Sequence, residues 1–183
     1  MGKGDIMDNI DSVSEEADRR GEEARKLFRY VRTDHRITQE DLETVGGKEG
    51  FLRIFGEVYR KFLADPVLKE LFDTSHADTA VIAEEHGRRF GLFHLWRYSD
   101  DPEYMQTRGS PLAALNRVHN RAKSSTLRRE EHRGRGFTTR QVNTWLGHHV
   151  CTIEENSVPD RLLQKLMSFH VSNLGFYGPF IRE

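Results

Sequence analysis

Histidine is the residue type in this sequence that is best suited to chemistry, and two of its nine copies lie where an imidazole could face a cavity. The stretch HGRRFGLFHLW spans residues 86–96, and at about 100° per helical residue it places His86, Phe90 and Phe93 on one apolar face. His119 follows a short helical segment that begins at Pro111. An imidazole in such a place is either a packed core residue or a metal ligand. For His86 taken alone, the packed core residue is the simpler interpretation.

The remaining histidines are expected to have ordinary structural roles. Three lie in polar segments that are typical of the surface: His35, His76 and His132. Three others lie on or beside apolar helical faces, where we expect packing residues with a polar tip: His94, His149 and His170. His148 points away from the helical face that carries Trp145. None of these seven is a candidate ligand.

The chain lacks the sequence signatures of the common enzyme classes. It contains no HExxH motif or Cys/His cluster for zinc, no G-x-S-x-G elbow, no P-loop and no G-x-G-x-x-G fingerprint after a strand. A haem site needs fewer protein ligands, because the porphyrin supplies four nitrogens and the protein adds only one axial ligand and an apolar pocket. A helical chain rich in Phe, Leu and Trp allows such a site.

Charge and composition limit the classes of partner that we expect the chain to bind and the cell compartment in which we expect it. Twenty-eight Lys and Arg against twenty-nine Asp and Glu leave a net charge of -1, which does not attract nucleic acid or an anionic membrane. The N-terminal segment has no apolar stretch long enough for a signal peptide or a membrane span. A single cysteine, Cys151, fits a reducing compartment. We therefore expect a cytoplasmic protein that binds neither nucleic acid nor membrane.

The elements that would hold these side chains are predicted to be helices. Apolar residues recur every three to four positions in four stretches: 51–63, 79–98, 142–153 and 162–174. Thr38 with Asp41, and Thr138 with Gln141, have the spacing of capping boxes, and Pro159 suits a first helical turn. No stretch alternates as a strand would, so the fold class is predicted to be all-α.

Two segments depart from this helical pattern. Residues 1 to about 20 are polar and acidic and are predicted to be a mobile tail, and a modest helical pattern runs from Glu22 to Arg36. We therefore expect residues 1–37 to be a flexible or partly helical extension and residues 38–183 to be the folded domain. Residues 123–136 (KSSTLRREEHRGRG) are predicted to be a basic surface loop.

The order and spacing of several short motifs resemble those of the truncated haemoglobins, specifically the group II branch. The resemblance covers residues 42 to 177 and is carried by the following motifs: Gly46-Gly47, Val58-Tyr59, Asp65-Pro66, Phe72, Trp96-Arg97-Tyr98, Pro102-x-Tyr104, Arg108-Gly109-x-Pro111, Leu115-x-x-x-His119 and Trp145-Leu146. HGRRF at 86–90 also resembles the His-Gly-Lys-Lys-Val of ordinary globins. Residues 1 to about 40 have no counterpart in the short family members, and loop 123–136 is longer than the family's usual link.

The resemblance implies a globin-like 2-over-2 helical sandwich that holds haem b between two helix pairs. His119 matches the proximal iron ligand, and Tyr59 matches the tyrosine that donates a hydrogen bond to the iron-bound ligand. Trp145 matches a tryptophan whose indole N–H can also reach that ligand. Phe72 and Phe90 would pack against the haem, and His86 would take the distal position, either facing the bound ligand or occupying the sixth iron site itself.

The implied function is reversible binding of O2, NO and CO at a histidine-ligated iron. Donors from Tyr59, His86 and Trp145 would slow O2 release, which suits NO dioxygenation or peroxidase-like chemistry better than bulk O2 transport. An unidentified reductase would be the protein partner, and we expect a monomer or weak homodimer. Two alternatives are a haem-based sensor or interaction module that uses the N-terminal extension or loop 123–136, and a helical scaffold without a cofactor.

Overall fold

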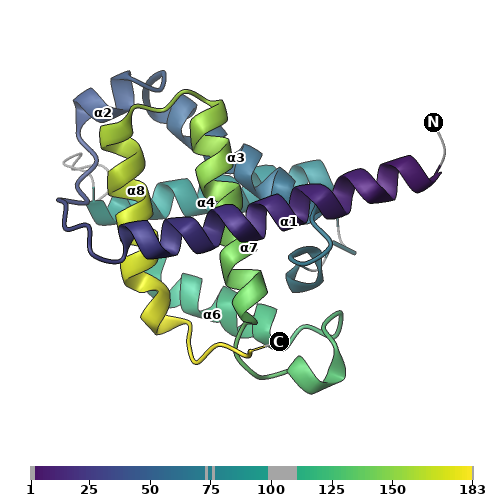
Figure 1. Cartoon of the computed structure of the whole chain (residues 1–183). Coiled ribbons are helices and arrows are strands. Elements are labelled where there is room, and N and C mark those ends of the chain that lie inside the picture. Colours follow the sequence, from purple (N-terminus) through teal and green to yellow (C-terminus); the bar gives the residue numbers. More distant parts are fainter. Residues whose placement is uncertain (1–2, 73, 76, 99–110, 183) are drawn as a thin grey trace.

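The computed structural model describes residues 3–72, 74–75, 77–98 and 111–182, and in these ranges every side chain except those of 3–11, 98, 111–116 and 176 (Figure 1). The α-helices are α1 Lys3–Phe28, α2 Gln39–Glu43, α3 Gly47–Ala64, α4 Thr79–Tyr98, α6 Pro111–Lys123, α7 Thr139–Glu155 and α8 Asp160–Asn173. Three short 3-10 helices are η1 Lys69–Leu71, η2 Glu130–His132 and η3 Leu174–Phe176. These ranges contain no β-strand, so the predicted all-α class is confirmed.

Two helix starts that the sequence predicts are confirmed as capping boxes. The Thr38 hydroxyl accepts the Asp41 N–H, and the Asp41 carboxylate accepts the Thr38 N–H at the start of α2. Thr138 and Gln141 make the same reciprocal pair at the start of α7. Each box satisfies two backbone N–H groups that a helix start leaves without an intrahelical acceptor. The first residues of α7, which border the site described below, are thereby fixed.

The expectation of a mobile tail over residues 1–20 is wrong for residues 12–20, which belong to α1. This helix packs against α7 and crosses it in Figure 1. Its buried positions recur every three to four residues and are mostly small: Ser14, Ala17, Gly21, Ala24 and Phe28. Small side chains produce a weak hydrophobic signal, yet they let two helix backbones approach closely. The helix also ends at Phe28, eight residues before the end of the pattern predicted from Glu22 to Arg36.

Two glycines make the contact between α1 and α7. A Cβ placed on Gly21 would lie 1.7 Å from the carbonyl oxygen of Asn143, and one on Gly147 would lie 1.8 Å from that of Ala17. No side chain larger than hydrogen fits at either position. Arg20 forms an ion pair with Glu154 beside this contact. The extension is therefore an integral layer over α7.

Helix α7 occupies the centre of the molecule. Most of its residues are buried, because α1, α3 and α8 all pack against it or its neighbours. Asn143 and Gly147, which face α1, lie about 200° around the helix from Trp145. Trp145 consequently faces α3 and α4 on the opposite side. Helix α3 in turn packs closely on α4, where a Cβ on Gly87 would lie 2.5 Å from the Phe55 carbonyl oxygen.

Loop 123–136 is not the simple surface loop that its composition predicts. Arg128 is buried, and its guanidinium donates hydrogen bonds to the carbonyl oxygens of Lys123, Arg135 and Gly136. His132, expected at the surface, is also buried. These carbonyl acceptors replace the water molecules that the guanidinium loses on burial. Arg128 thus organises the loop around itself, and η2 forms within it.

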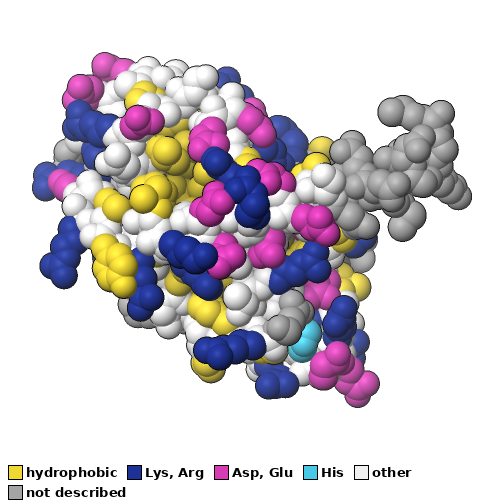
Figure 2. Space-filling model, in the orientation of Figure 1, with side chains coloured by type: hydrophobic (Ala, Val, Ile, Leu, Met, Phe, Trp, Pro, Cys, Tyr) yellow, Lys and Arg dark blue, Asp and Glu magenta, His cyan; other side chains and the backbone are white. Residues whose placement is uncertain are grey.

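The surface carries charges of both signs. Figure 2 shows Lys, Arg, Asp and Glu side chains intermixed over the face that carries α1, in keeping with the net charge of -1. Among the helices in the described ranges, none is long and apolar enough to cross a membrane.

Candidate functional site

Five of the six predicted site residues form one aromatic cluster. Tyr59 comes from α3, Phe72 follows η1, His86 and Phe90 come from α4, and Trp145 comes from α7. The ring centroids of Tyr59 and His86 lie 5.8 Å apart, and Phe72 lies 6.0 Å from Tyr59 and 5.9 Å from His86. Phe90 lies 6.2 Å from Tyr59 and 6.3 Å from Trp145. Segments far apart in the sequence thus bring these rings together.

The position of His86 follows from the close approach of α3 and α4. Gly87 contacts the backbone at Gly56, and one helical turn beyond Gly56 lies Tyr59. His86, next to Gly87, therefore meets the Tyr59 ring, and it is half-buried there. Behind them the fully buried Phe62 ring stacks on both Phe72 and Trp145, with centroid distances of 6.4 Å.

The hydroxyl of Tyr59 stays protonated at ordinary pH. Burial, and to a smaller extent the neighbouring Tyr177, raise the pKa of Tyr59 well above its usual value. Burial likewise raises the pKa of Tyr177 to about 12. A protonated phenol is a hydrogen-bond donor. The aromatic cluster therefore contains a donor in Tyr59 and a second one in the indole N–H of Trp145.

His119, the sixth predicted residue, lies on α6 and contacts Tyr177 rather than the cluster itself. Its ring centroid is 4.5 Å from that of Tyr177 in an edge-on arrangement and 6.1 Å from that of Phe137. Tyr177 thus lies between the environments of His119 and Tyr59. The sequence did not single out Tyr177, because it lies in the irregular C-terminal segment.

The His119 imidazole has the form that a metal ligand needs. Burial, with a smaller contribution from Lys123, lowers its pKa to about 4, so the ring is neutral at neutral pH. Its Nδ1 atom is buried and has no hydrogen-bond partner among the described residues. A neutral imidazole has one nitrogen lone pair available for coordination. His119 therefore fits an axial iron ligand, and the aromatic cluster fits the apolar wall that a porphyrin requires.

A second group of imidazoles lies behind the aromatic cluster, and the sequence did not reveal it. His94, His149 and His170 are buried and come from α4, α7 and α8. The His149 and His170 centroids lie 4.4 Å apart, and those of His94 and His170 lie 5.1 Å apart. Their packing role was predicted, but their contact with one another was not. We call these three residues the histidine core.

The histidine core is neutral and supports Trp145. Burial lowers the pKa of His94 and of His149 to about 3, and lowers that of His170 well below its usual value. The Nδ1–H of His149 donates to the Trp145 carbonyl at 2.8 Å, and the His149 ring lies 4.3 Å from the Trp145 ring. The histidine core thus packs directly against Trp145.

His148 points away from Trp145, as predicted, and is buried against Asp65. Its Nε2 lies 2.8 Å from the Asp65 carboxylate, which also accepts the Ser14 hydroxyl and the Val67 N–H. Burial alone would raise the pKa of Asp65, but the hydrogen bond from His148 and the others outweigh it and lower this pKa. The pair joins α1, the end of α3 and α7. Asp65 belongs to the Asp65-Pro66 motif of the sequence, but its pairing with His148 was not predicted.

Some residues of the sequence analysis that are not among the six predicted site residues lie outside the described residues. This applies to His76, Pro102, Tyr104, Arg108 and Gly109, and to the side chains of Tyr98, Pro111 and Leu115. Among the residues that are described, no three His, Cys, Asp or Glu side chains come together as a metal-binding group. Comparisons with protein-family models, with curated proteins and with solved structures find no match to this chain.

Proposed function

We propose that this chain binds haem b between His119 and the aromatic cluster and acts as a globin of the truncated type. The observation that carries the proposal is the convergence of Tyr59, His86 and Trp145 from α3, α4 and α7. These residues were selected from the sequence as the polar groups of one pocket, and they are separated by up to 86 positions in the chain. Chance alone would not be expected to bring them together.

The proposed fold is the 2-over-2 sandwich, with α3 and α4 as one pair and α7 and α8 as the other. The packing of α3 on α4, of α7 on α8 and of α3 on α7 supports this arrangement. In this arrangement α6 would carry His119, whose ring contacts Tyr177 and Phe137. The additional helix α1 covers the face of α7 that is turned away from Trp145.

His119 would be the axial ligand of the iron. Its imidazole is neutral over the whole physiological range, so no proton has to leave before the ring nitrogen can bind a metal. Tyr177 packs edge-on against the ring and limits its rotation. When bound, haem supplies an iron with one further coordination position for O2, NO or CO.

Tyr59, Trp145 and His86 would act on the diatomic ligand. Bound O2 carries partial negative charge, and each charge-assisted hydrogen bond to it contributes about 1.5 to 3 kcal/mol. The Tyr59 hydroxyl remains protonated because of its burial, so it can donate at any ordinary pH. Since about 1.4 kcal/mol corresponds to a factor of ten, these donors would slow O2 release strongly. We therefore infer NO dioxygenation or peroxidase-like chemistry with an external reductase, rather than bulk transport.

Haem titration of the purified full chain tests the proposal. We expect stoichiometric binding with an intense Soret band, and loss of the native spectrum in His119→Ala. His35→Ala is the matched control, because His35 is also half-buried but packs against Phe169, away from the aromatic cluster. Its spectrum should equal that of the parent. A protein that stays colourless, or a His119→Ala variant with the parent spectrum, would contradict the proposal.

The proposed site could take two forms, which differ in whether His86 faces the bound ligand or binds the iron itself. If His86 faces the ligand, the ferrous protein is five-coordinate and has one broad visible band. If His86 binds the iron itself, the spectrum has sharp, split visible bands that disappear in His86→Leu. An unchanged split spectrum in His86→Leu would exclude His86 as the sixth ligand.

A further inference from the structure

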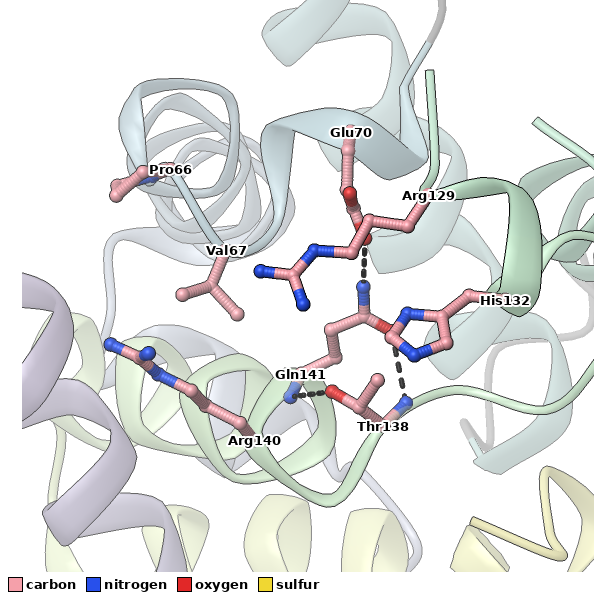
Figure 3. A pocket seen from close by; sticks show the side chains of 8 residues that line it. All are labelled: Pro66, Val67, Glu70, Arg129, His132, Thr138, Arg140 and Gln141. Carbon is pink, nitrogen blue, oxygen red and sulfur yellow. Dashed lines mark hydrogen bonds between the residues drawn. The ribbon is translucent and has the colours of Figure 1, made fainter. Parts of the chain in front are cut away.

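A polar hollow lies at the N-terminal end of α7, outside the aromatic cluster. It has a volume of about 210 Å³ and lies between η1, η2 and the first turn of α7 (Figure 3). Drug-sized ligands occupy pockets of roughly 300–1,000 Å³, so this one suits a smaller molecule. Its polar lining consists of Glu70, Arg129, His132, Thr138, Arg140 and Gln141.

Arg129 is available for a ligand, unlike the other arginines of its loop. Arg128, Arg133 and Arg135 all donate hydrogen bonds to carbonyl oxygens of the loop itself. The Arg129 guanidinium has no hydrogen bond or ion pair with a described residue, and it projects between Val67 and Gln141 in Figure 3. Arg140, on the first turn of α7, is likewise unpaired within the described ranges.

His132 is the second, independent indication of a ligand. It is only 7 % exposed and lines the hollow, where its ring faces Thr138 and Gln141 (Figure 3). Its ring nitrogens have no hydrogen-bond partner among the residues described. Although the residue is largely buried, its ring nitrogens are not among the fully buried atoms without a partner, so they open into the hollow, where a polar molecule can bond to them.

The charges around the hollow favour an anion. Glu70 is its one carboxylate, and the Glu70 Oε1 atom already accepts the Gln141 side-chain amide at 2.5 Å and lies 4.0 Å from the buried Arg128. The positive charge of Arg128 therefore compensates the negative charge of Glu70, and the positive charges of Arg129 and Arg140 have no opposite charge in the lining of the hollow. The first turn of α7 adds the positive end of the helix dipole and the Arg140 N–H, which has no intrahelical acceptor.

We propose that this hollow binds a phosphate group, as the free ion or as the ester of a small molecule. Arg129 and Arg140 supply charge-assisted donors, His132 an imidazole donor that opens into the hollow, and the Arg140 N–H a backbone donor at the helix start. Residues of loop 123–136 and of the start of α7 form part of the hollow, and Gln141 is one turn from Trp145. The proposal does not depend on haem, and its test requires none.

Calorimetric titration of the full chain tests it with two probes, inorganic phosphate and glycerol phosphate, in a chloride buffer of constant ionic strength. We expect binding of at least one probe, with tighter binding of glycerol phosphate if an ester is the ligand. Arg129→Gln and Arg140→Gln should each weaken binding about tenfold to a hundredfold, since each removes a charge-assisted hydrogen bond. Both side chains are exposed, so the variants should fold. Arg32→Gln, another exposed arginine, is the control and should bind like the parent.

The location is checked by amide chemical shifts of the 15N-labelled protein. Phosphate should move the N–H resonances of Arg140 and His132 in the parent and leave them in place in Arg129→Gln. Failure of both probes to bind at millimolar concentration would overturn the proposal. Equal binding by the parent, Arg129→Gln and Arg140→Gln would do the same.

Discussion

The Nε2 atoms of His94 and His170 lie 3.1 Å apart in the core and join α4 to α8. Such a contact is a hydrogen bond only while one nitrogen carries a hydrogen and the other has a free lone pair. Both side chains are almost completely buried, so no water can replace the bond. The contact therefore persists only while at least one of the two rings is neutral.

Acid should destabilise the protein through the histidine core. The folded pKa values of His94 and His149 are about 3, whereas an unfolded histidine titrates near 6.5. Between these values the unfolded chain binds protons that the folded chain does not. The free energy of unfolding should fall by about 1.4 kcal/mol per imidazole for each pH unit below about 6.5. Urea denaturation between pH 7 and 5 measures this slope.

The variant His94→Gln tests whether the histidine core causes this acid sensitivity. It removes one of the three imidazoles, so the slope below pH 6.5 should decrease by about 1.4 kcal/mol per pH unit. Above pH 7.5 all three rings are neutral in both states, and the slope there should be the same in variant and parent. An identical slope at acidic pH would mean that His94 is not a source of the acid sensitivity.

Asp65→Ala should destabilise the fold strongly. The change leaves His148 buried without its partner and removes the acceptor for Ser14 and Val67. Breaking a buried pair in this way costs about 3–5 kcal/mol. Glu155→Gln is the control, because its ion pair with Lys61 is exposed and contributes about 1 kcal/mol or less. Equal losses of unfolding free energy in the two variants would refute a structural role for the buried pair.

Gly147→Ala should loosen α1, although alanine is the better helix former by about 1 kcal/mol. The added Cβ would lie 1.8 Å from the Ala17 carbonyl oxygen, so α1 must shift away from α7. We expect a net loss of about 1–3 kcal/mol in unfolding free energy. We also expect faster tryptic cleavage at Arg19, Arg20 and Arg25. Gly175→Ala is the control, since a Cβ there meets nothing within 4 Å. A Gly147→Ala protein as stable and as resistant as the parent would argue against this contact.

Tyr59→Phe tests the proposed donor without disturbing the packing. The variant loses only a hydroxyl, so in the haem-loaded protein O2 should dissociate about tenfold to a hundredfold faster. Stopped-flow replacement of O2 by CO measures this rate. Tyr30→Phe, at a position that is 80 % exposed, should have the rate of the parent. An unchanged rate in Tyr59→Phe would assign the hydrogen bond to another residue.

The sequence predicts those elements whose pattern is strong and local. Helices α3, α4 and α7 combine large apolar residues at helical spacing with clear start or stop signals, such as Thr138 before α7 and Pro66 after α3. The cluster around Tyr59 was also selected from the sequence, through the order of motifs along the chain. Periodicity alone would not have connected Tyr59 with Trp145.

The features that the sequence missed depend on contacts that apolar periodicity does not encode. Helix α1 buries small residues, and only the spacing of Ser14, Ala17 and Gly21 could have revealed its packed face. Arg128 is buried because loop carbonyls happen to surround its guanidinium, and composition carries no such information. The histidine core combines residues of three helices, each of which looks ordinary in its own helix.

The packing of α1 on α7 also affects how the chain is made. Arg20 and its partner Glu154 are 134 residues apart, so α1 is synthesised long before the helix that covers its small-residue face. At about 5–20 residues per second, the ribosome needs roughly 7 to 27 s to cover that distance. During this interval the N-terminal helix lacks α7, its main docking surface. Helix α1 is therefore among the last of these helices to reach its native place.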